Sequence, residues 1–344
     1  GMRIAQIAPL YEAVPPRLYG GTERVISYLT EELVRRGHEV TLFASGDSVT
    51  ESQLVAVSPE ALRLSKTLVD PFPYHTLQLG LVFDRSDEFD VIHSHVDYYA
   101  FPYTRLVETP VVTTLHGRLD LPELQAIYEE YPELNLVSIS DDQRRPLAHL
   151  ELNWLATVYH GLPPDQLGPF HAESGKYLAF LGRISPEKRP EIAILIAKET
   201  GIPLKIAAKV DPVDETFFEH AVKPLIDPGI IEFVGEITEK ERKGFLGQAY
   251  ATLFPIEWPE PFGLIMIESL SCGTPVIARR FGSVPEVMTD GVTGFVCSSV
   301  REMIDAVGRI PEIDRKACRS HVQERFTDSV MAENYESVYA RLRG

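Results

Sequence analysis

The sequence predicts an α/β protein with two doubly wound, parallel-sheet domains of the Rossmann-like type. Length is the first reason, because 344 residues amount to about two domains of common size. The second reason is that short apolar runs alternate with helical patterns, which is typical of parallel sheets. The third is a break in this alternation at residues 161–176, after which it starts again.

The first half has the order of elements that opens a parallel α/β domain. Residues 3–9 form a short apolar strand, and residues 22–36 have the periodicity of a helix. Gly20 and Gly21 lie in the loop between them. Further strands are predicted at residues 39–44, 90–92, 111–114 and 136–139.

The second half repeats this order. A strand at residues 177–181 leads through Gly182 to a helix at residues 190–199. Further strands are predicted at residues 203–208, 231–234, 251–254, 275–278 and 294–296. Two such domains that face each other leave a deep cleft, where open parallel sheets bind ligands beyond the carboxyl ends of their strands.

Composition and charge exclude several classes of protein. Hydrophobic residues make up 44% of the chain and charged residues 24%, which excludes disorder as its main state. The formal net charge of -17 repels a phosphate backbone, so nucleic acid is not an expected partner. No apolar run reaches the roughly 18 to 20 residues that span a bilayer. The N-terminal residues lack an apolar secretory segment, so we expect a cytoplasmic protein.

The segment from Glu260 to Glu268 is the most informative part of the chain. A helix that begins near Phe262 would place its N-terminus between the two acids, about 12 Å apart, which suits a diphosphate flanked by two sugars. Glu268 would then bind ribose hydroxyls and Glu260 the transferred sugar. The diphosphate would meet the free backbone N–H groups of Phe262, Gly263 and Leu264. An ordinary buried helix with one solvated acid is the alternative.

Two cations follow the strand at residues 177–181. Arg183 and Lys188 would neutralise a leaving diphosphate, because Arg offers a bidentate fork for phosphate oxygens and Lys a compact charge. A solvated turn with surface charges is the alternative. The sequence has no convincing Asp-x-Asp site and no His or Cys spacing typical of zinc, so we expect no metal ligands and no cofactor.

The first half contributes glycines and histidines. Gly20 and Gly21 would allow a close approach of the backbone to phosphate or sugar. His116 follows a predicted strand, so it would hydrogen-bond the sugar or stabilise developing charge, and a satisfied loop histidine is the alternative. We interpret His93 and His95 as structural residues, since no further zinc ligands accompany them.

Taken together, these elements resemble the retaining glycosyltransferases of family 4, the group 1 transferases, which have the GT-B fold. The resemblance covers nearly the whole chain, and its strongest part is the run Glu260-Pro261-Phe262-Gly263-Leu264 that leads to Glu268. The other motifs are Gly20-Gly21, Arg36-Gly37-His38-Glu39-Val40, Asp90-Val91-Ile92-His93, Leu115-His116-Gly117, Ser138-Ile139-Ser140, Gly182-Arg183 with Lys188, Gly273-Thr274-Pro275-Val276-Ile277 and Asp290-Gly291-Val292-Thr293-Gly294-Phe295.

The chain departs from the family pattern at two places. It has His160-Gly161-Leu162-Pro163 where many members have Asn-Gly-Val-Asp, and Gly282-Ser283 where many have two glycines. The second place is in a loop that the family pattern puts near the donor. Neither change removes a charged group that the chemistry requires.

The resemblance also implies a domain organisation and a set of roles. Residues 1–165 would form an acceptor-side domain, residues 166–327 a donor domain, and residues 328–344 a helix that crosses back to the first domain. The family needs no catalytic metal and uses a front-face mechanism, without a nucleophile from the enzyme. The implied donor contacts are Arg183, Lys188, Gly20 and Gly21 on the diphosphate, Glu268 on the ribose, and Glu260 and His116 on the sugar.

These observations and the resemblance together predict a transferase that moves a hexose from a nucleotide-diphosphate sugar, and the resemblance implies that it is metal-independent and retaining. UDP-glucose is the first donor to test, and the acceptor is a glycan or a lipid-linked sugar in polysaccharide or glycoconjugate biosynthesis. A sugar-nucleotide epimerase of the same fold and a non-catalytic sugar-nucleotide-binding protein are the alternatives. Peripheral contact with the inner face of the membrane, through Arg and Lys patches, is a further option.

Overall fold

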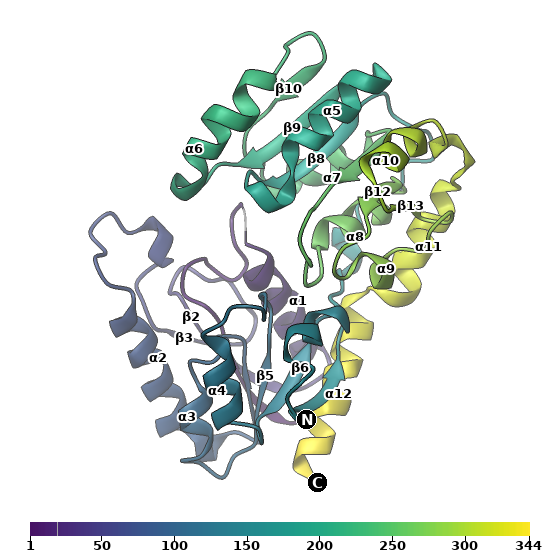
Figure 1. The fold of residues 1–344 in the computed structure, drawn as a ribbon. Coiled ribbons are helices and arrows are strands. Elements are labelled where there is room, and N and C mark those ends of the chain that lie inside the picture. The colour runs from purple at the N-terminus through teal and green to yellow at the C-terminus, as the bar shows by residue number, and fades with distance from the viewer. Residues whose placement is uncertain (19) are drawn as a thin grey trace. The chain divides into compact units, whose positions relative to one another are not determined.

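The structure is a computed structural model, and it describes residues 1–18 and 20–344. The chain divides into two compact units: an N-terminal unit of residues 1–161 and 328–344, and a C-terminal unit of residues 162–327. Each unit is built on a parallel β-sheet flanked by helices (Figure 1). The prediction of two doubly wound α/β domains is confirmed.

The sheet of the N-terminal unit has the strand order β3-β2-β1-β4-β5-β6-β7 within the described residues. The order reverses between β1 and β4, and ligands of open parallel sheets bind at the carboxyl ends next to such a reversal. The strands are β1 (Arg3–Ile7), β2 (Glu39–Ala44), β3 (Gln53–Ala56), β4 (Val91–Ser94), β5 (Val111–Thr114), β6 (Asn135–Ser138) and β7 (Asn153–Thr157).

Alternate side chains of these strands pack on opposite faces of the sheet, as the pleat requires. On one face, Ala5 and Phe43 share an apolar core with α2 (Phe72–Asp84). On the other face, Leu42 packs with Ile26 of α1 (Gly21–Arg35). The short helices α3 (Phe101–Thr104) and α4 (Leu124–Glu130) complete the unit.

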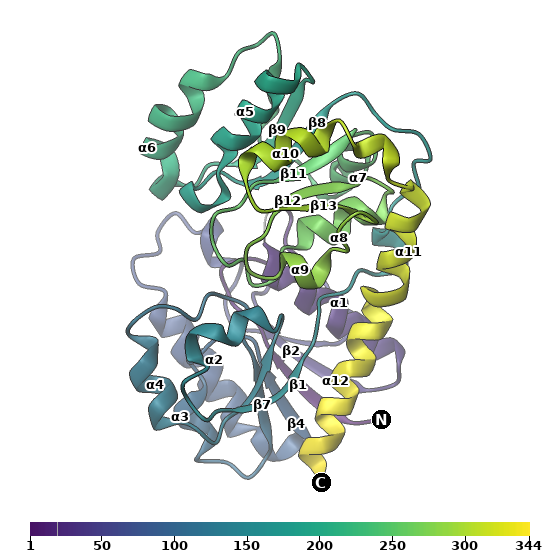
Figure 2. The ribbon, with the colours of Figure 1, turned by 45° about the vertical axis from the view of Figure 1, so that its right-hand side comes forward.

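The C-terminal helix α12 (Asp328–Arg343) belongs to the N-terminal unit and packs beside α1 and β4 (Figure 2, yellow). Ion pairs hold its first turn and its middle, since Arg35 lies 3.0 Å from Asp328 and Arg36 lies 2.7 Å from Glu336. The helix thereby covers the face of the sheet that carries polar side chains from β1, β4 and β5.

The described sheet of the C-terminal unit has the order β10-β9-β8-β11-β12-β13, with its reversal between β8 and β11. The helices α5 (Pro190–Thr200) and α10 (Val300–Val307) pack together, and α8 (Leu264–Ser271) packs with α7 (Glu239–Gly247) and α11 (Arg315–Arg325). The shorter α6 (Glu215–Phe217) and α9 (Val284–Val287) lie in the connections. The strands are β8 (Leu178–Arg183), β9 (Leu204–Lys209), β10 (Ile231–Phe233), β11 (Ala251–Phe254), β12 (Val276–Arg279) and β13 (Gly294–Cys297).

Two further features are the cysteines and the absence of membrane-spanning helices among the described residues. Cys272, Cys297 and Cys318 are buried and form no disulfide bond. Within residues 1–18 and 20–344, no helix combines the length and the apolar character that crossing a membrane requires.

Candidate functional site

Charged side chains of the C-terminal unit gather at the carboxyl ends of β8, β11 and β12. Arg183 is the last residue of β8, and Lys188 lies in the turn after it. The loop after β11 contributes Glu257 and Glu260, and Arg279 is the last residue of β12. Because these three strands are neighbours in the sheet, their ends lie at one edge, next to the reversal of strand order.

Each of the two predicted cations faces a carboxylate. The Nζ atom of Lys188 lies 2.7 Å from Oε2 of Glu260, and their side chains are only 14% and 12% exposed. A guanidinium nitrogen of Arg183 lies 3.2 Å from Glu187. The Lys188 ammonium also lies 5.4 Å from the ring centroid of Trp258, close enough for a cation–π contact. The structure therefore brings Lys188 and Glu260, which the sequence suggested for different parts of a donor, into direct contact.

Arg279 is a further cation at this edge that sequence reasoning missed. One guanidinium nitrogen lies 3.9 Å from Glu257, while Nε and Nη1 are buried without a hydrogen-bond partner. Burial, and secondly the nearby charge of Arg189, lowers the pKa of Arg279. Buried polar groups without partners are uncommon, so these N–H groups are candidates for ligand contact. The only signal in the sequence is the place of Arg279 at the end of a strand.

The helix α8 begins later than the sequence suggested. Its N-cap is Gly263, with φ of 86°, and its first residue is Leu264, whereas the prediction placed the start near Phe262. A Cβ atom on Gly263 would lie 2.9 Å from Cε of Met266, so both the conformation and the space favour glycine. The first-turn N–H groups therefore begin at Leu264, and the buried Phe262 is a packing residue ahead of the helix.

Glu268 lies in the second turn of α8 and is held by Arg242 of α7. Two parallel hydrogen bonds join them, from Nε to Oε2 at 3.0 Å and from Nη2 to Oε1 at 2.5 Å. This bidentate geometry fixes the plane of the carboxylate and leaves its other lone pairs as acceptors. Sequence reasoning missed Arg242, because nothing in the charged run of α7 distinguishes it from neighbouring solvated residues.

Gly20 and Gly21 lie at the carboxyl end of β1 in the N-terminal unit, where α1 begins. Gly20 has φ of 150°, and a Cβ atom there would lie 2.9 Å from Cβ of Pro16. Gly21 is the first residue of the helix. Glu23, in the same turn, is 7% exposed, and burial raises its pKa to about 7. The start of α1 thus combines a backbone without side chains and a carboxyl that is half protonated near neutral pH.

His116 follows β5 by two residues and lies in a group of histidines, of which His93, His95 and His160 are buried. Its Nε2 lies 2.9 Å from Nδ1 of His95, and its ring stacks on that of His160 with centroids 5.6 Å apart. Burial lowers the pKa of His116 to about 4, so the ring is neutral at neutral pH and serves as a hydrogen-bonding group rather than a cation. His93 and His95 are 0% and 3% exposed, in agreement with a structural role.

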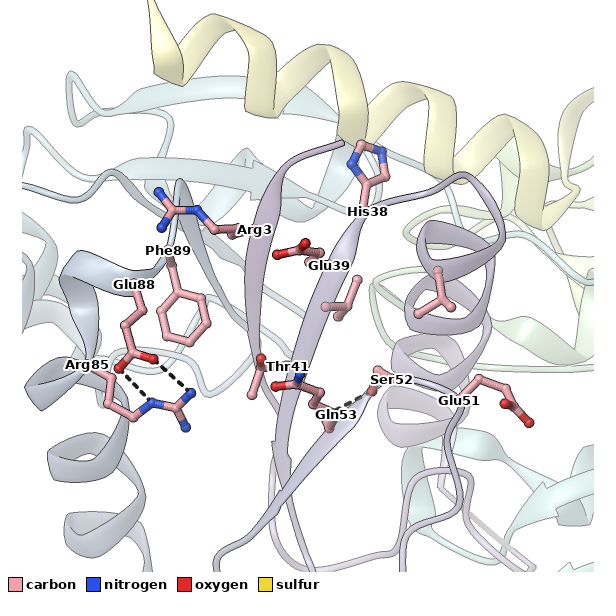
Figure 3. A pocket seen from close by; sticks show the side chains of 12 residues that line it. Arg3, His38, Glu39, Thr41, Glu51, Ser52, Gln53, Arg85, Glu88 and Phe89 are labelled. Carbon is pink, nitrogen blue, oxygen red and sulfur yellow. Dashed lines mark hydrogen bonds and ion pairs between the residues drawn. The ribbon is translucent and has the colours of Figure 1, made fainter.

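The N-terminal unit also has a cavity of about 420 Å³ at the opposite, amino end of β1, β2 and β3 (Figure 3). Both of its arginines are paired with carboxylates. Arg85 donates two hydrogen bonds to Glu88, at 3.0 Å and 3.2 Å, and Arg3 pairs with Asp90 at 3.1 Å. The residues singled out from the sequence lie at the other end of the strands, so we do not include this cavity in the site.

Within the described part of the chain, no group of three or more His, Cys, Asp and Glu side chains is arranged to hold a metal ion.

Two family models match consecutive parts of the chain. The model described as Glycosyltransferase Family 4 matches residues 19–165, and Glycosyl transferases group 1 matches residues 168–318. The chain belongs to the family 4, group 1 glycosyltransferases. The matched regions contain the glycine turn, the histidine group and the charged edge described above.

Individual relatives agree with this assignment. Glycogen synthase from Mycobacterium tuberculosis is 24% identical, over 86% of this chain and 82% of that protein. D-inositol 3-phosphate glycosyltransferase from Mycolicibacterium smegmatis is 26% identical, over 80% of this chain and 74% of that protein. The structure of Anabaena Alr3699/HepE in complex with UDP-glucose has a TM-score of 0.77 at 14% identity, and the match covers 99% of this chain and 100% of that chain. The fold of this glycosyltransferase is GT-B.

Proposed function

We propose that this glycosyltransferase is a retaining hexosyltransferase that uses a UDP-linked sugar, with glucose as the first candidate. The acceptor would be a glycan or a lipid-linked sugar. The observation that carries the proposal is the set of cations at the carboxyl ends of β8 and β12, each held near a carboxylate from the turn after β8 or the loop after β11. Anabaena Alr3699/HepE has the same fold and binds UDP-glucose, which supports this choice of donor.

In the proposed complex, the donor diphosphate replaces the carboxylates as the partner of the cations. Arg183 and Lys188 would donate charge-assisted hydrogen bonds to phosphate oxygens, each worth about 1.5–3 kcal/mol. Glu260, released from Lys188, would accept hydrogen bonds from hydroxyls of the sugar. The exchange would give both Lys188 and Glu260 a new partner when they separate, which avoids the cost of an isolated buried charge at this pair.

The nucleoside end of the donor would lie along α8. The first-turn N–H groups that begin at Leu264, after Gly263, would donate to a phosphate oxygen at the positive end of the helix. Glu268 would accept hydrogen bonds from the ribose hydroxyls through the lone pairs that Arg242 leaves free. Phe262 would contribute packing rather than an N–H group.

The reaction we propose is a front-face displacement. The acceptor hydroxyl forms a bond to the anomeric carbon on the side from which the nucleoside diphosphate leaves, and its proton passes to a donor phosphate oxygen. The bond between the anomeric carbon and the phosphate oxygen breaks, so the products are the glycoside, with its configuration retained, and UDP. Arg183 and Lys188 would stabilise the charge of the leaving group, a task that otherwise falls to a metal ion.

The N-terminal unit would contribute neutral groups. His116 would form a hydrogen bond with a sugar hydroxyl, and Gly20 with Gly21 would allow backbone contact with phosphate. We assign no base and no nucleophile to this unit.

Calorimetry with UDP, GDP, ADP and their sugar conjugates, with and without EDTA, tests the donor part of the proposal. Micromolar binding of UDP or UDP-glucose that survives EDTA is expected. Lys188→Met should weaken this binding, whereas the matched variant Lys205→Met should not, because Lys205 is exposed on β9 and pairs with Glu232. Binding of none of the nucleotides would contradict the proposal.

The stereochemical part has a separate test. Proton NMR of the product formed from UDP-α-glucose distinguishes the two anomers while the reaction proceeds. An α-linked product is expected, and a β-linked product would refute retention even if the donor is correct.

A further inference from the structure

A continuous set of hydrogen bonds in the N-terminal unit joins the C-terminal helix to His116. Gln6 of β1 donates from Nε2 to the hydroxyl of Tyr339 on α12, at 3.4 Å, and its Oε1 lies 2.6 Å from Nε2 of His95. Nδ1 of His95 lies 2.9 Å from Nε2 of His116. His93, next to Gln6 in the sheet register, bonds Tyr339 at 2.6 Å.

The proton positions follow from the chemistry of the partners. An amide oxygen can only accept, so Nε2 of His95 must carry the proton that is shared with Gln6. Burial is the main cause that lowers the pKa of His95, and the neighbouring rings of His93, His116 and His160 lower it further. His95 is therefore neutral and has one ring proton. Its Nδ1 must accept, and the Nε2 atom of His116 must donate.

The orientation of the Gln6 amide determines which atoms of Gln6, His95 and His116 donate hydrogen bonds and which accept them. A separation of 2.6 Å from the His95 nitrogen is at the short end for an N–H···O bond, and a pair of nitrogen atoms would need more space. The oxygen therefore faces His95 and the NH₂ group faces Tyr339.

These proton positions determine the state of Nδ1, the other ring nitrogen of His116. Because this ring is also neutral, Nδ1 has a lone pair and no proton, and it is buried without a hydrogen-bond partner. Buried acceptors without a partner are uncommon, so this atom is a candidate for contact with a donor from a ligand, and sugar hydroxyls are donors.

We propose that Gln6 is a positioning residue that acts through His95 to fix the tautomer of His116, so that Nδ1 of His116 accepts a hydrogen bond from a hydroxyl of the sugar substrate. The inference rests on the proposed function for its substrate, and it adds a direction to the contact: His116 accepts and the sugar donates. The opposite tautomer would present an N–H group and would leave the hydroxyl proton of the sugar without an acceptor.

The tautomer can be measured without activity. Long-range ¹H–¹⁵N correlation spectra of the ¹⁵N-histidine-labelled protein distinguish a protonated ring nitrogen from one with a lone pair, and His116→Gln assigns the signal. The expected result is one tautomer of His116, with the proton on Nε2. A proton on Nδ1 in the unmodified protein overturns the inference and leaves the proposed function in place.

Two variants distinguish a role of Gln6 in fixing the tautomer of His116 from a role in packing alone. Gln6→Met removes the acceptor of His95, so both tautomers of His116 should appear and kcat/KM for sugar transfer should fall about tenfold or more. Tyr339→Phe removes the hydroxyl that bonds Gln6 and His93 but leaves the bonds from Gln6 to His116. It should lower thermal stability while His116 keeps its tautomer and most of the turnover.

The outcomes separate the two proposals. If Gln6→Met keeps the tautomer of the unmodified protein, or if Tyr339→Phe changes it equally, Gln6 has only a packing role and the inference fails. If His116→Gln transfers sugar normally while the spectra are as expected, the proposed role of His116 in the reaction fails instead, and the contact to the sugar falls with it.

Discussion

The pair of Lys188 and Glu260 allows the structural role of two charges to be separated from their proposed role in donor binding. Lys188→Met and Glu260→Gln each leave one charge without a partner, and the double variant removes both charges. Breaking a buried pair costs about 3–5 kcal/mol, and the residual exposure of 14% and 12% reduces this to about 2 kcal/mol. A domain of this size loses about 2–4 °C of Tm per kcal/mol, so each single variant should melt about 4–8 °C lower.

The double variant should be less destabilised than the sum of the two single variants. Its apolar and amide side chains leave no unpaired charge, so a coupling energy of about 1–2 kcal/mol is expected from thermal or urea unfolding of the four proteins. A coupling energy below about 0.3 kcal/mol would refute the view that the two charges hold each other.

The two single variants should have similar effects on stability but different effects on activity. If Lys188 stabilises the leaving diphosphate, Lys188→Met should lower kcat about 10²-fold, as the loss of one charge-stabilising donor does in other enzymes. Glu260→Gln should lower sugar transfer but leave the Kd of UDP within about twofold, because UDP lacks the sugar that Glu260 is proposed to bind. Initial rates and calorimetry at a temperature well below both melting points measure these effects. An unchanged kcat in folded Lys188→Met would remove the assignment to the leaving group.

Three further predictions concern other residues. Burial raises the pKa of Glu23 from 4.5 to about 7, so the folded state keeps a proton that the unfolded state releases; stability should fall by up to about 3 kcal/mol between about pH 4.5 and 7. Glu23→Gln should abolish this fall in urea titrations at pH 5 and pH 8, and equal pH slopes would contradict it. Arg242→Met should weaken UDP binding about tenfold in calorimetry, because Glu268 loses the partner that orients it. The exposed control variant Arg301→Met should leave UDP binding unchanged. Arg315→Met should cost about 3 kcal/mol in thermal unfolding, since the guanidinium is buried and bonded to three acceptors; a loss below about 1 kcal/mol would mean that water replaces it.

The sheets were predictable because their central strands are buried on both faces. β2, β5 and β11 have the predicted bounds, since each is a short apolar run with clear limits. The strands β3 and β7 were missed, and both lie at the edges of the N-terminal sheet. The side chains of an edge strand are only half covered, so their sequence does not differ enough from that of a loop.

Local sequence singled out the charged residues of the candidate site but could not predict their pairing. Spacing and the family pattern pointed to Glu260, Glu268, Arg183 and Lys188. In the structure, Lys188 pairs with Glu260 across 72 positions of sequence, and Glu268 pairs with Arg242 across 26. Such contacts depend on which strands are neighbours, and this information is absent from local spacing. The start of α8 was misplaced for a local reason, because the left-handed conformation of Gly263 delays the helix.

The histidine group shows the same limit more sharply. His93 and His95 occupy neighbouring positions at the end of one strand, but their partners come from β1, β5 and α12, so no single segment predicts the network. The hydrogen-bond partners around the rings fix the proton positions. These partners come together only when the sheet and the C-terminal helix have packed.

The negative net charge of the chain opposes the binding of the proposed anionic donor. The charged side chains at the carboxyl ends of β8, β11 and β12 explain how such binding would still be possible. The protein has a formal charge of -17, which repels nucleotides at long range. At physiological ionic strength the Debye length is about 8 Å, so a bound diphosphate responds mainly to groups in its immediate surroundings. There, Arg183, Lys188 and Arg279 meet Glu187, Glu257 and Glu260, and the ligand-free edge is close to neutral. In the proposed complex, a diphosphate that takes over the cations would replace anions of similar charge. Its affinity would then come from geometry and the helix N-terminus rather than from an attractive overall field.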